Sequence, residues 1–263
     1  MLTDTHCHLD FESFDDDRKQ VLDRSRKDGI ERILVPGINL FSCQKSVDLT
    51  SWDDILYAAV GYHPNEINHW DQNSVDELRR LATHSKVVAI GEIGLDYFRD
   101  STPRGLQRMV FEEQLNLAQD LELPVVIHNR QASEDLISIL RDWHAGLKAS
   151  GSTLADRPGV LHSFSEEVDF AHQAFEINFY VGISGPVTFQ NARKLQKVVT
   201  SIPLDKILIE TDAPFLTPHP FRGKRNEPSY VRLVANQIAE LQNETLSSVA
   251  QKTTINANML FEW

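Results

Sequence analysis

Eight short apolar runs recur along the 263 residues of the sequence, and a longer segment with helical spacing follows each of them. The runs cover residues 2–5, 32–36, 55–61, 87–91, 124–127, 159–161, 178–183 and 206–210. Between them, apolar residues recur at three- and four-residue spacing, as in Phe111, Leu115 and Ala118, which indicates amphipathic helices. Strands that alternate with helices form βαβ units and a parallel sheet. The sequence therefore predicts an α/β fold.

A closed (β/α)₈ barrel accommodates eight such units without edge strands, and about 250 residues is its usual length. An open doubly wound sheet is the alternative. That fold normally carries a Gly-rich phosphate turn after its first strand, where this chain has His6, Cys7 and His8. No Gly/Ser linker, low-complexity tract or short repeat marks a domain boundary. We predict one domain over residues 1–263, folded as a single (β/α)₈ TIM barrel.

The charge balance limits the partners of this fold. The sequence has 26 Lys and Arg residues against 38 Asp and Glu residues, a net charge of −12, so the surface as a whole repels polyanions. This excludes a non-specific nucleic-acid coat protein but not a local cationic site. The chain begins without the basic and apolar segments of a secretory signal, and its longest apolar run, residues 55–60, is far shorter than a membrane span. With two cysteines in a chain of this length, we expect a cytoplasmic protein.

Side chains that bind metal ions follow five of the eight apolar runs. A barrel places its functional residues at the carboxyl ends of its strands. At these ends the sequence has His6 and His8 after the first run, Glu92 after the fourth, His128 after the fifth, His162 after the sixth and Asp212 after the eighth. We expect these four imidazoles and two carboxylates to face one mouth of the barrel.

This set predicts a metal centre, although each member alone is weak evidence. A single histidine at a strand end is more often packed or solvated than a ligand. Five of the ten histidines, however, fall at predicted strand ends: His6, His8, His63, His128 and His162. Six ligands are too many for one tetrahedral ion and suit two ions that share a carboxylate, an arrangement that activates water for hydrolysis. Other barrel hydrolases bridge their two ions with a carboxylated lysine on the fourth strand. The nearest lysine here, Lys86, lies at the amino end of the fourth run, so Glu92 is the predicted bridge.

The remaining polar residues near the strand ends have two interpretations each. Asp212 is our candidate general base, because a metal-binding carboxylate can also take a proton from water; its alternative role is that of a ligand alone. His63 precedes Pro64 and is predicted to touch the phosphate or the leaving group of a substrate, unless it is a satisfied loop histidine. Asp96 is either a carboxylate that orients a ligand imidazole or a turn residue. Glu210 is either a carboxylate that supports a metal ligand or a packing residue lower in the barrel, and we interpret it as structural.

A basic cluster in the loop after the eighth run supplies the predicted local cationic site. It consists of Arg222, Lys224 and Arg225, within an otherwise acidic chain. These side chains can neutralise a phosphodiester, so we predict that they bind substrate. The alternative is that they are solvated loop cations.

The sequence resembles the TatD family of metal-dependent deoxyribonucleases, which belong to the amidohydrolase-like barrels. The matching segments are DTHCHLD (residues 4–10), GYHP (61–64), GEIGLDY (91–97), PVVIH (124–128), HSF (162–164), ETDAP (210–214) and RGKRNEP (222–228). The resemblance extends over essentially the whole chain. It implies that His6, His8 and Asp212 hold one divalent cation, that His128 and His162 hold the other, and that Glu92 bridges them.

The resemblance further implies a hydrolase that acts on ester bonds, with two Mg, Mn or Zn ions and with DNA or another phosphodiester as substrate. The expected activity is that of a 3′-5′ exonuclease-like deoxyribonuclease that works through a metal-bridged hydroxide. Two alternatives stay open. One is hydrolysis of a carboxylic ester or amide, such as a D-aminoacyl-tRNA, at the same site; the other is a metal-bound scaffold without catalysis. Neither a membrane nor an obligate protein partner is expected.

Overall fold

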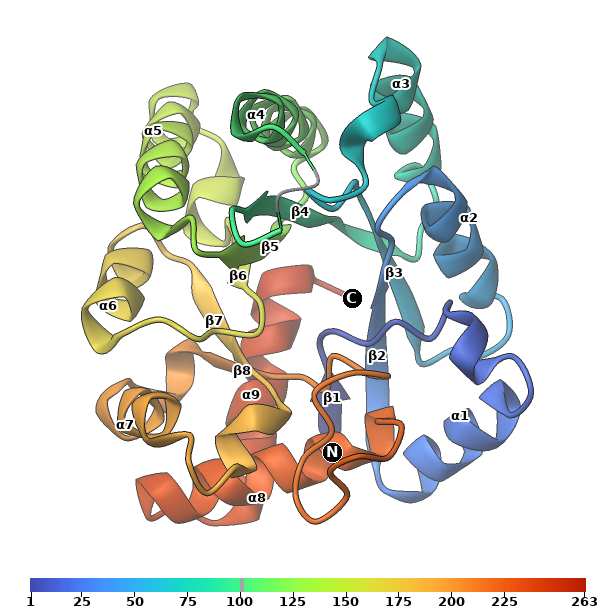
Figure 1. The fold of residues 1–263 in the computed structure, drawn as a ribbon, viewed down its shortest axis with the longest axis vertical. Helices are drawn as coiled ribbons and strands as arrows, with labels where there is room; N and C mark the ends of the chain where they lie inside the picture. The colour runs from blue at the N-terminus through green and yellow to red at the C-terminus, as the bar shows by residue number, and fades with distance from the viewer. Residues whose placement is uncertain (100–101) are drawn as a thin grey trace.

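In a computed structural model, which describes residues 1–99 and 102–263, eight parallel strands follow one another around a barrel (Figure 1). The strands are β1 (Leu2–Asp4), β2 (Ile30–Pro36), β3 (Leu56–Val60), β4 (Val87–Asp96), β5 (Val125–Arg130), β6 (Gly159–Leu161), β7 (Tyr180–Ile183) and β8 (Ile207–Ile209). Each strand pairs with the next along the chain. The predicted alternation of strands and helices is confirmed.

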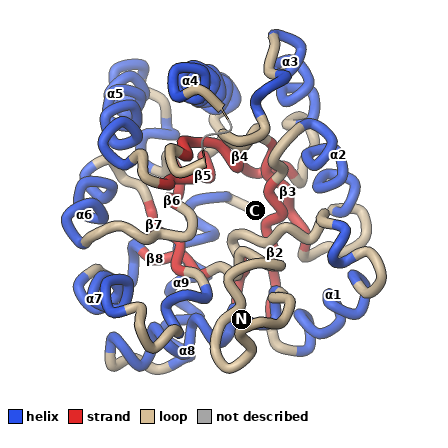
Figure 2. The backbone as a smooth tube through the Cα atoms, viewed as in Figure 1, coloured by secondary structure: helices blue, strands red, loops and turns tan. Residues whose placement is uncertain are grey.

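Helices surround this barrel, as Figure 2 shows. They are α1 (Arg18–Lys27), α2 (Leu40–Leu49), α3 (Gln72–Leu81), α4 (Arg104–Leu121), α5 (Ser133–Ser150), α6 (Val168–Glu176), α7 (Arg193–Ser201), α8 (Val231–Gln242) and α9 (Leu246–Phe261). The first seven connect consecutive strands, and the last two follow β8. Within the described ranges, no helix combines the length and the apolar character needed to cross a membrane.

The two ends of the sheet meet just beyond β1 and β8. The Thr5 N–H donates to the Ile209 carbonyl at 3.1 Å, and Cys7 forms a parallel bridge with Ala213. This nearly closed sheet confirms the predicted (β/α)₈ barrel over the open alternative.

Two strands extend beyond the carboxyl ends of their apolar runs. β4 continues to Asp96 and β5 to Arg130, because they pair with each other from Ile93 opposite Ile127 onward. Glu92 and His128 therefore lie within strands and not after them, which corrects the prediction. Polar residues such as Glu92, Asp96 and His128 interrupt the continuous apolar runs in these segments and hid the pairing, since one face of each strand points into the mouth of the barrel.

The interior of the barrel is layered by the alternation of side chains along each strand. At the bottom, inward residues such as Leu34, Val126 and Leu208 pack against the end of α9, including Leu260. Figure 1 shows α9 running behind the strands to the C-terminus. Two residues further along β5, about 6.6 Å higher at the usual rise per residue, lies His128. The polar site thus rests on an apolar floor.

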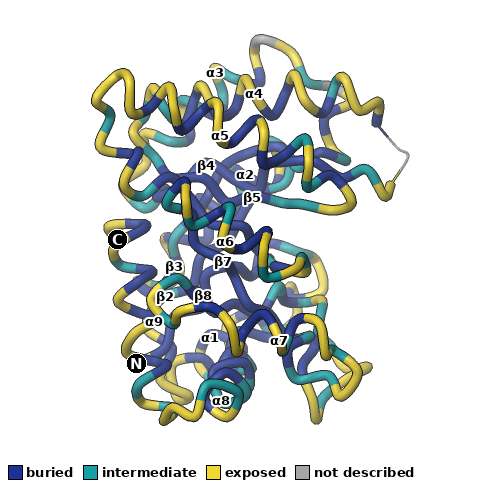
Figure 3. The backbone as a smooth tube through the Cα atoms, turned by 90° about the vertical axis from the view of Figure 1, so that its left-hand side faces the viewer, coloured by how far each residue is buried: buried dark blue, intermediate teal, exposed yellow. Residues whose placement is uncertain are grey.

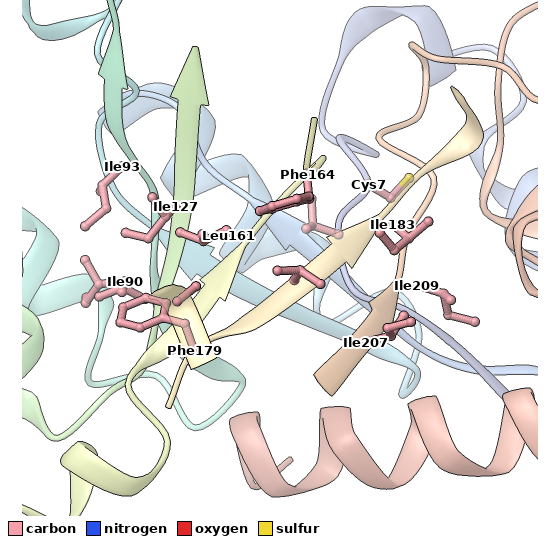
Figure 4. Close-up of a cluster of buried hydrophobic side chains, with 14 of the residues drawn as sticks. Cys7, Ile90, Ile93, Ile127, Leu161, Phe164, Phe179, Ile183, Ile207 and Ile209 are labelled. Carbon is pink, nitrogen blue, oxygen red and sulfur yellow. The ribbon is translucent and has the colours of Figure 1, made fainter. Parts of the chain in front are cut away.

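The outward side chains form the larger core between strands and helices. Figure 4 shows part of it, with Ile90, Ile127, Leu161 and Ile207 among the buried residues. In Figure 3 the strands are buried, whereas the helices alternate between buried and exposed positions, as expected for amphipathic segments. Full burial of each such side chain contributes about 1.5–3 kcal/mol, which holds the strand ends in a rigid frame.

Candidate metal centre

Four donor atoms from three parts of the chain meet at the mouth of the barrel. The Nε2 atoms of His6 and His8 are 3.2 Å apart, and they lie 3.4 and 3.6 Å from Glu92 Oε2. Asp212 Oδ1 is 3.8 Å from His6 Nε2 and 3.7 Å from His8 Nε2. His6 and His8 follow β1, Glu92 lies in β4 and Asp212 follows β8. The predicted convergence of these four residues is present in the structure.

These separations fit a common cation. Tetrahedral ligands about 2.1 Å from an ion are about 3.4 Å from one another, which matches the five observed distances of 3.2–3.8 Å. Without a cation, one of the two facing nitrogens of His6 and His8 can donate to the other, whereas the lone pairs of both can bind a shared cation. The Nδ1 atoms of both rings are buried, with no hydrogen-bond partner among the described residues.

A second group of donors surrounds the other oxygen of Glu92. Glu92 Oε1 lies 2.9 Å from His128 Nδ1, 2.9 Å from His162 Nε2 and 3.7 Å from His63 Nε2. Oε2 faces His6 and His8, so the two oxygens of one carboxylate face two sets of imidazoles. Among the described residues, the sets that can hold an ion are His6, His8 and Asp212; His6, Glu92 and His162; and His63, Glu92 and His128. Glu92 is thus placed as a bridge would be.

Two carboxylates outside these sets lie beside the imidazoles of His128 and His162. Asp96 Oδ2 lies 3.3 Å from His128 Nε2, within hydrogen-bond distance, whereas Glu210 Oε1 lies 3.7 Å from His162 Nδ1, beyond that distance. Asp96 favours a proton on His128 Nε2, so that Nδ1 of the neutral ring can bind an ion. Asp96 is therefore placed to orient a ligand, one of its two predicted roles, whereas Glu210 accepts the backbone N–H of Ser163.

His63 has the opposite tautomer. Its Nδ1 accepts the backbone N–H of Asn65 at 3.1 Å, so in the neutral ring the proton lies on Nε2, the nitrogen that faces the site. A protonated nitrogen donates a hydrogen bond and does not bind a cation. Although His63 lies with His128 and Glu92, this hydrogen bond favours its predicted role as a substrate contact.

Burial and charge determine the protonation of the centre. Burial lowers the pKa values of His6 and His8 to about 4, which keeps these ligands neutral. Burial also raises the pKa of Asp212 to about 7, against the opposing effect of His162. Burial also acts to raise the pKa of Glu92, but neighbouring histidines, above all His162, hold this pKa well below its ordinary value. Glu92 is therefore a permanent anion between two sets of imidazoles.

Asp4 was not predicted as a site residue, yet it holds the segment that carries the first donor set. Its buried carboxyl accepts the Thr211 N–H at 2.9 Å, the Thr211 hydroxyl at 2.6 Å and the His6 N–H at 3.3 Å. Burial raises the pKa of Asp4 to about 8. These bonds tie β1 to the end of β8, where Asp212 adopts a left-handed backbone with φ of 57° and donates its N–H to the His6 carbonyl.

The donors open into a cavity of about 600 Å³. Its lining includes His8, His63, Glu92, Asp96, His128, His162 and Asp212, together with Phe11, Phe215, Asn65, Glu66, Arg99 and Arg130. A cavity of this size accommodates a small organic ligand or part of a polymer.

The predicted basic cluster lies outside this lining. Arg225 bonds both oxygens of Asp17, at 2.7 Å each, and stacks on Phe14 at the side of the barrel near α1. The Arg222 guanidinium lies 4.0 Å from the centre of the Phe189 ring. None of the cluster, which also includes Lys224, is among the described residues that line the cavity. The structure does not bring these cations to the donors, and their role in binding substrate stays a prediction.

Comparisons with known proteins find relatives that match this chain over nearly its whole length. Residues 3–262 match the sequence model of a family described as TatD related DNase. The metal-dependent hydrolase YabD of Bacillus subtilis is 45% identical over 261 residues, which cover 99% of each chain. The 3'-5' ssDNA/RNA exonuclease TatD of Erwinia tasmaniensis is 33% identical over 264 residues, with 98% of each chain covered. The crystal structure of YjjV, a TatD homologue from Escherichia coli, has a TM-score of 0.91 at 32% identity and covers 100% of this chain and 98% of its own.

Proposed function

The chain belongs to the TatD family of metal-dependent hydrolases, and on this basis we propose that it cleaves phosphodiester bonds in DNA from the 3′ end. We further propose that it uses two divalent cations. The name of the Erwinia relative supports the substrate and the direction of cleavage. The cavity of about 600 Å³ above the donors supports the access of a strand end, because it is large enough for part of a polymer.

One observation carries the two-cation proposal. Glu92 directs Oε2 to His6 and His8, and Oε1 to His128 and His162. A carboxylate placed in this way binds one ion through each oxygen, as in hydrolases with paired ions. The donor set of imidazoles and carboxylates suits Zn or Mn better than Mg, which prefers oxygen ligands.

The protein residues have distinct roles in this reaction. Bound divalent cations supply Lewis acidity, which lowers the pKa of a water and neutralises charge on the phosphate. Asp212 accepts the proton of the attacking water on its carboxylate, since it lies on the cavity lining beside His8. His63 donates from Nε2 to a phosphate oxygen or to the leaving group. Asp96 keeps His128 in the tautomer described above.

The test is a hydrolysis assay on metal-stripped protein with Mg, Mn or Zn added back. The substrates are single-stranded DNA, duplex DNA, RNA and simple carboxylic esters. We expect metal-dependent loss of nucleotides from the 3′ end of DNA. Asp212→Asn should lower kcat by about 10²–10⁴-fold, the usual contribution of a general base, whereas the exposed Glu240→Gln on α8 serves as an unaffected control. Consumption of an ester while DNA survives with every metal would refute the nuclease assignment.

A further inference from the structure

The arginines of the cavity wall come from the turn after β4 and from the end of β5, and not from the loop after β8. Arg99 and Arg130 are the two basic side chains among the described lining residues, beside the carboxylates of Glu66, Glu92, Asp96 and Asp212. In Figure 1 the loop after β4 and the loop after β8 lie on opposite sides of the mouth. A polyanionic strand that enters this acidic cavity requires compensating charge, and this wall supplies it.

Arg130 stands above the metal ligands on the same face of its strand. Val126, His128 and Arg130 alternate with outward residues along β5, so all three point into the barrel. The Cα of Arg130 is about 6.6 Å nearer the mouth than that of His128 at the usual rise of a strand. Its guanidinium lies 3.8 Å from the centre of the Phe98 ring, a side chain that is 54% exposed. This stacking directs Arg130 to the rim and away from the ligands.

The turn that carries Arg99 is fixed before any ligand binds. Asp96 Oδ1 accepts the backbone N–H groups of Phe98 and Arg99, each at 3.0 Å. The buried side chain of Gln107 in α4 holds the Asp96 backbone at both its N–H and its carbonyl. Asp96 also faces His128, so one carboxylate links the arginine wall to the metal ligands.

Both guanidiniums are available to an anion. In residues 1–99 and 102–263, no carboxylate oxygen lies within 4.0 Å of Arg99 or Arg130. Arg225 differs, because Asp17 already neutralises it. Planar guanidiniums with free N–H groups bind phosphate oxygens in pairs.

We propose that Arg99 and Arg130 bind a backbone phosphate of a nucleic-acid strand, next to the phosphate that is cut. This inference rests on the proposed function and adds the residues that hold the strand. The wall acts on a polymer and not on a small diester, because its cations lie at the rim and the reacting phosphate lies at Glu92.

The experiment compares Arg99→Ala and Arg130→Ala with Arg141→Ala, which removes an exposed arginine from the outer surface of α5. Binding of the metal-loaded protein to a fluorescein-labelled phosphorothioate decathymidylate, which resists cleavage, is followed by anisotropy at several salt concentrations. Each wall substitution should weaken binding about tenfold and reduce the salt slope by at most about 0.7, the value for the one phosphate of a single strand that the two arginines share. Arg141→Ala should change neither quantity.

Turnover of two substrates separates this role from a structural one. Arg130→Ala should raise KM for decathymidylate but leave hydrolysis of bis(p-nitrophenyl) phosphate about unchanged, because the small diester has no neighbouring phosphate. Equal binding by all three variants would overturn the proposal. A parallel loss on both substrates would also overturn it, since Arg130 would then act through Asp96 and His128. If the wild type binds the strand but cleaves neither substrate, the proposed function fails, while the binding comparison still decides the role of the wall.

Discussion

Replacing Asp96 by asparagine tests whether this carboxylate prepares His128 to bind a cation. Asp96 Oδ1 accepts two backbone N–H groups, and Oδ2 accepts from Asn65 at 3.0 Å and faces His128 Nε2 at 3.3 Å. In the variant the remaining oxygen keeps the backbone bonds, and the new NH₂ faces the imidazole N–H. Loss of such a carboxylate partner lowers metal affinity about 10–100-fold, or about 1.4–2.7 kcal/mol.

The assay is calorimetric titration of Mn²⁺ into metal-stripped protein. We expect Asp96→Asn to weaken the binding step that involves His128 and to leave the step at His6 and His8 close to that of the wild type. Asp120→Asn on α4 is the matched control, because Asp120 is exposed and pairs with Arg79 far from the cavity. An unchanged Mn²⁺ affinity in a folded Asp96→Asn protein would refute the tautomer argument for this centre.

Three further predictions concern other parts of the chain. His63→Gln should lower kcat/KM about 100-fold, as for the loss of one hydrogen-bond donor to the transition state, yet retain two ions by elemental analysis; loss of an ion would make His63 a ligand. Gly182→Ala should lower the free energy of unfolding of the metal-free protein by about 1–3 kcal/mol, measured by urea denaturation, because the new Cβ would lie 2.7 Å from Glu210 Cδ. Gly146→Ala should raise this free energy by about 0.5–1 kcal/mol, because its new Cβ meets open space. Burial lowers the pKa of His144, so its contribution to stability is present above the unfolded pKa of about 6.5 and is lost as pH falls. Metal-free wild type should therefore lose more unfolding free energy than His144→Gln between pH 7 and pH 5, and parallel losses would contradict this.

Local pattern was enough to predict the barrel and the residues that converge at its mouth. All eight apolar runs correspond to strands, because buried parallel strands are continuously apolar whatever surrounds them. The position of His162 and Asp212 at strand ends then followed from the chemistry of barrels. The end of β4 was misplaced, since the continuous apolar run stops before Glu92, whereas Ile93 and Leu95 continue the strand only in alternation with other residues and pair with β5, about 30 residues away in sequence.

The role proposed for Arg99 and Arg130 was not predicted, because only tertiary contacts distinguish these two arginines from the others in the chain. Arg225 was predicted to bind substrate from its place in a basic cluster, and the structure pairs it with Asp17, 208 residues earlier in the chain. Arg130 was not predicted to bind substrate, although it lies two residues after His128 and shares its face of the strand. That period-two relation was the available signal, and it required β5 to continue past the apolar run.

The central claim is that Glu92 bridges two cations, and anomalous diffraction from crystals of the Mn²⁺-loaded protein tests it directly. We predict two Mn peaks about 3.5–4 Å apart, one near His6 and His8 and one near His128 and His162, each in contact with a different oxygen of Glu92. A single peak, or two peaks of which one does not touch Glu92, would contradict this claim.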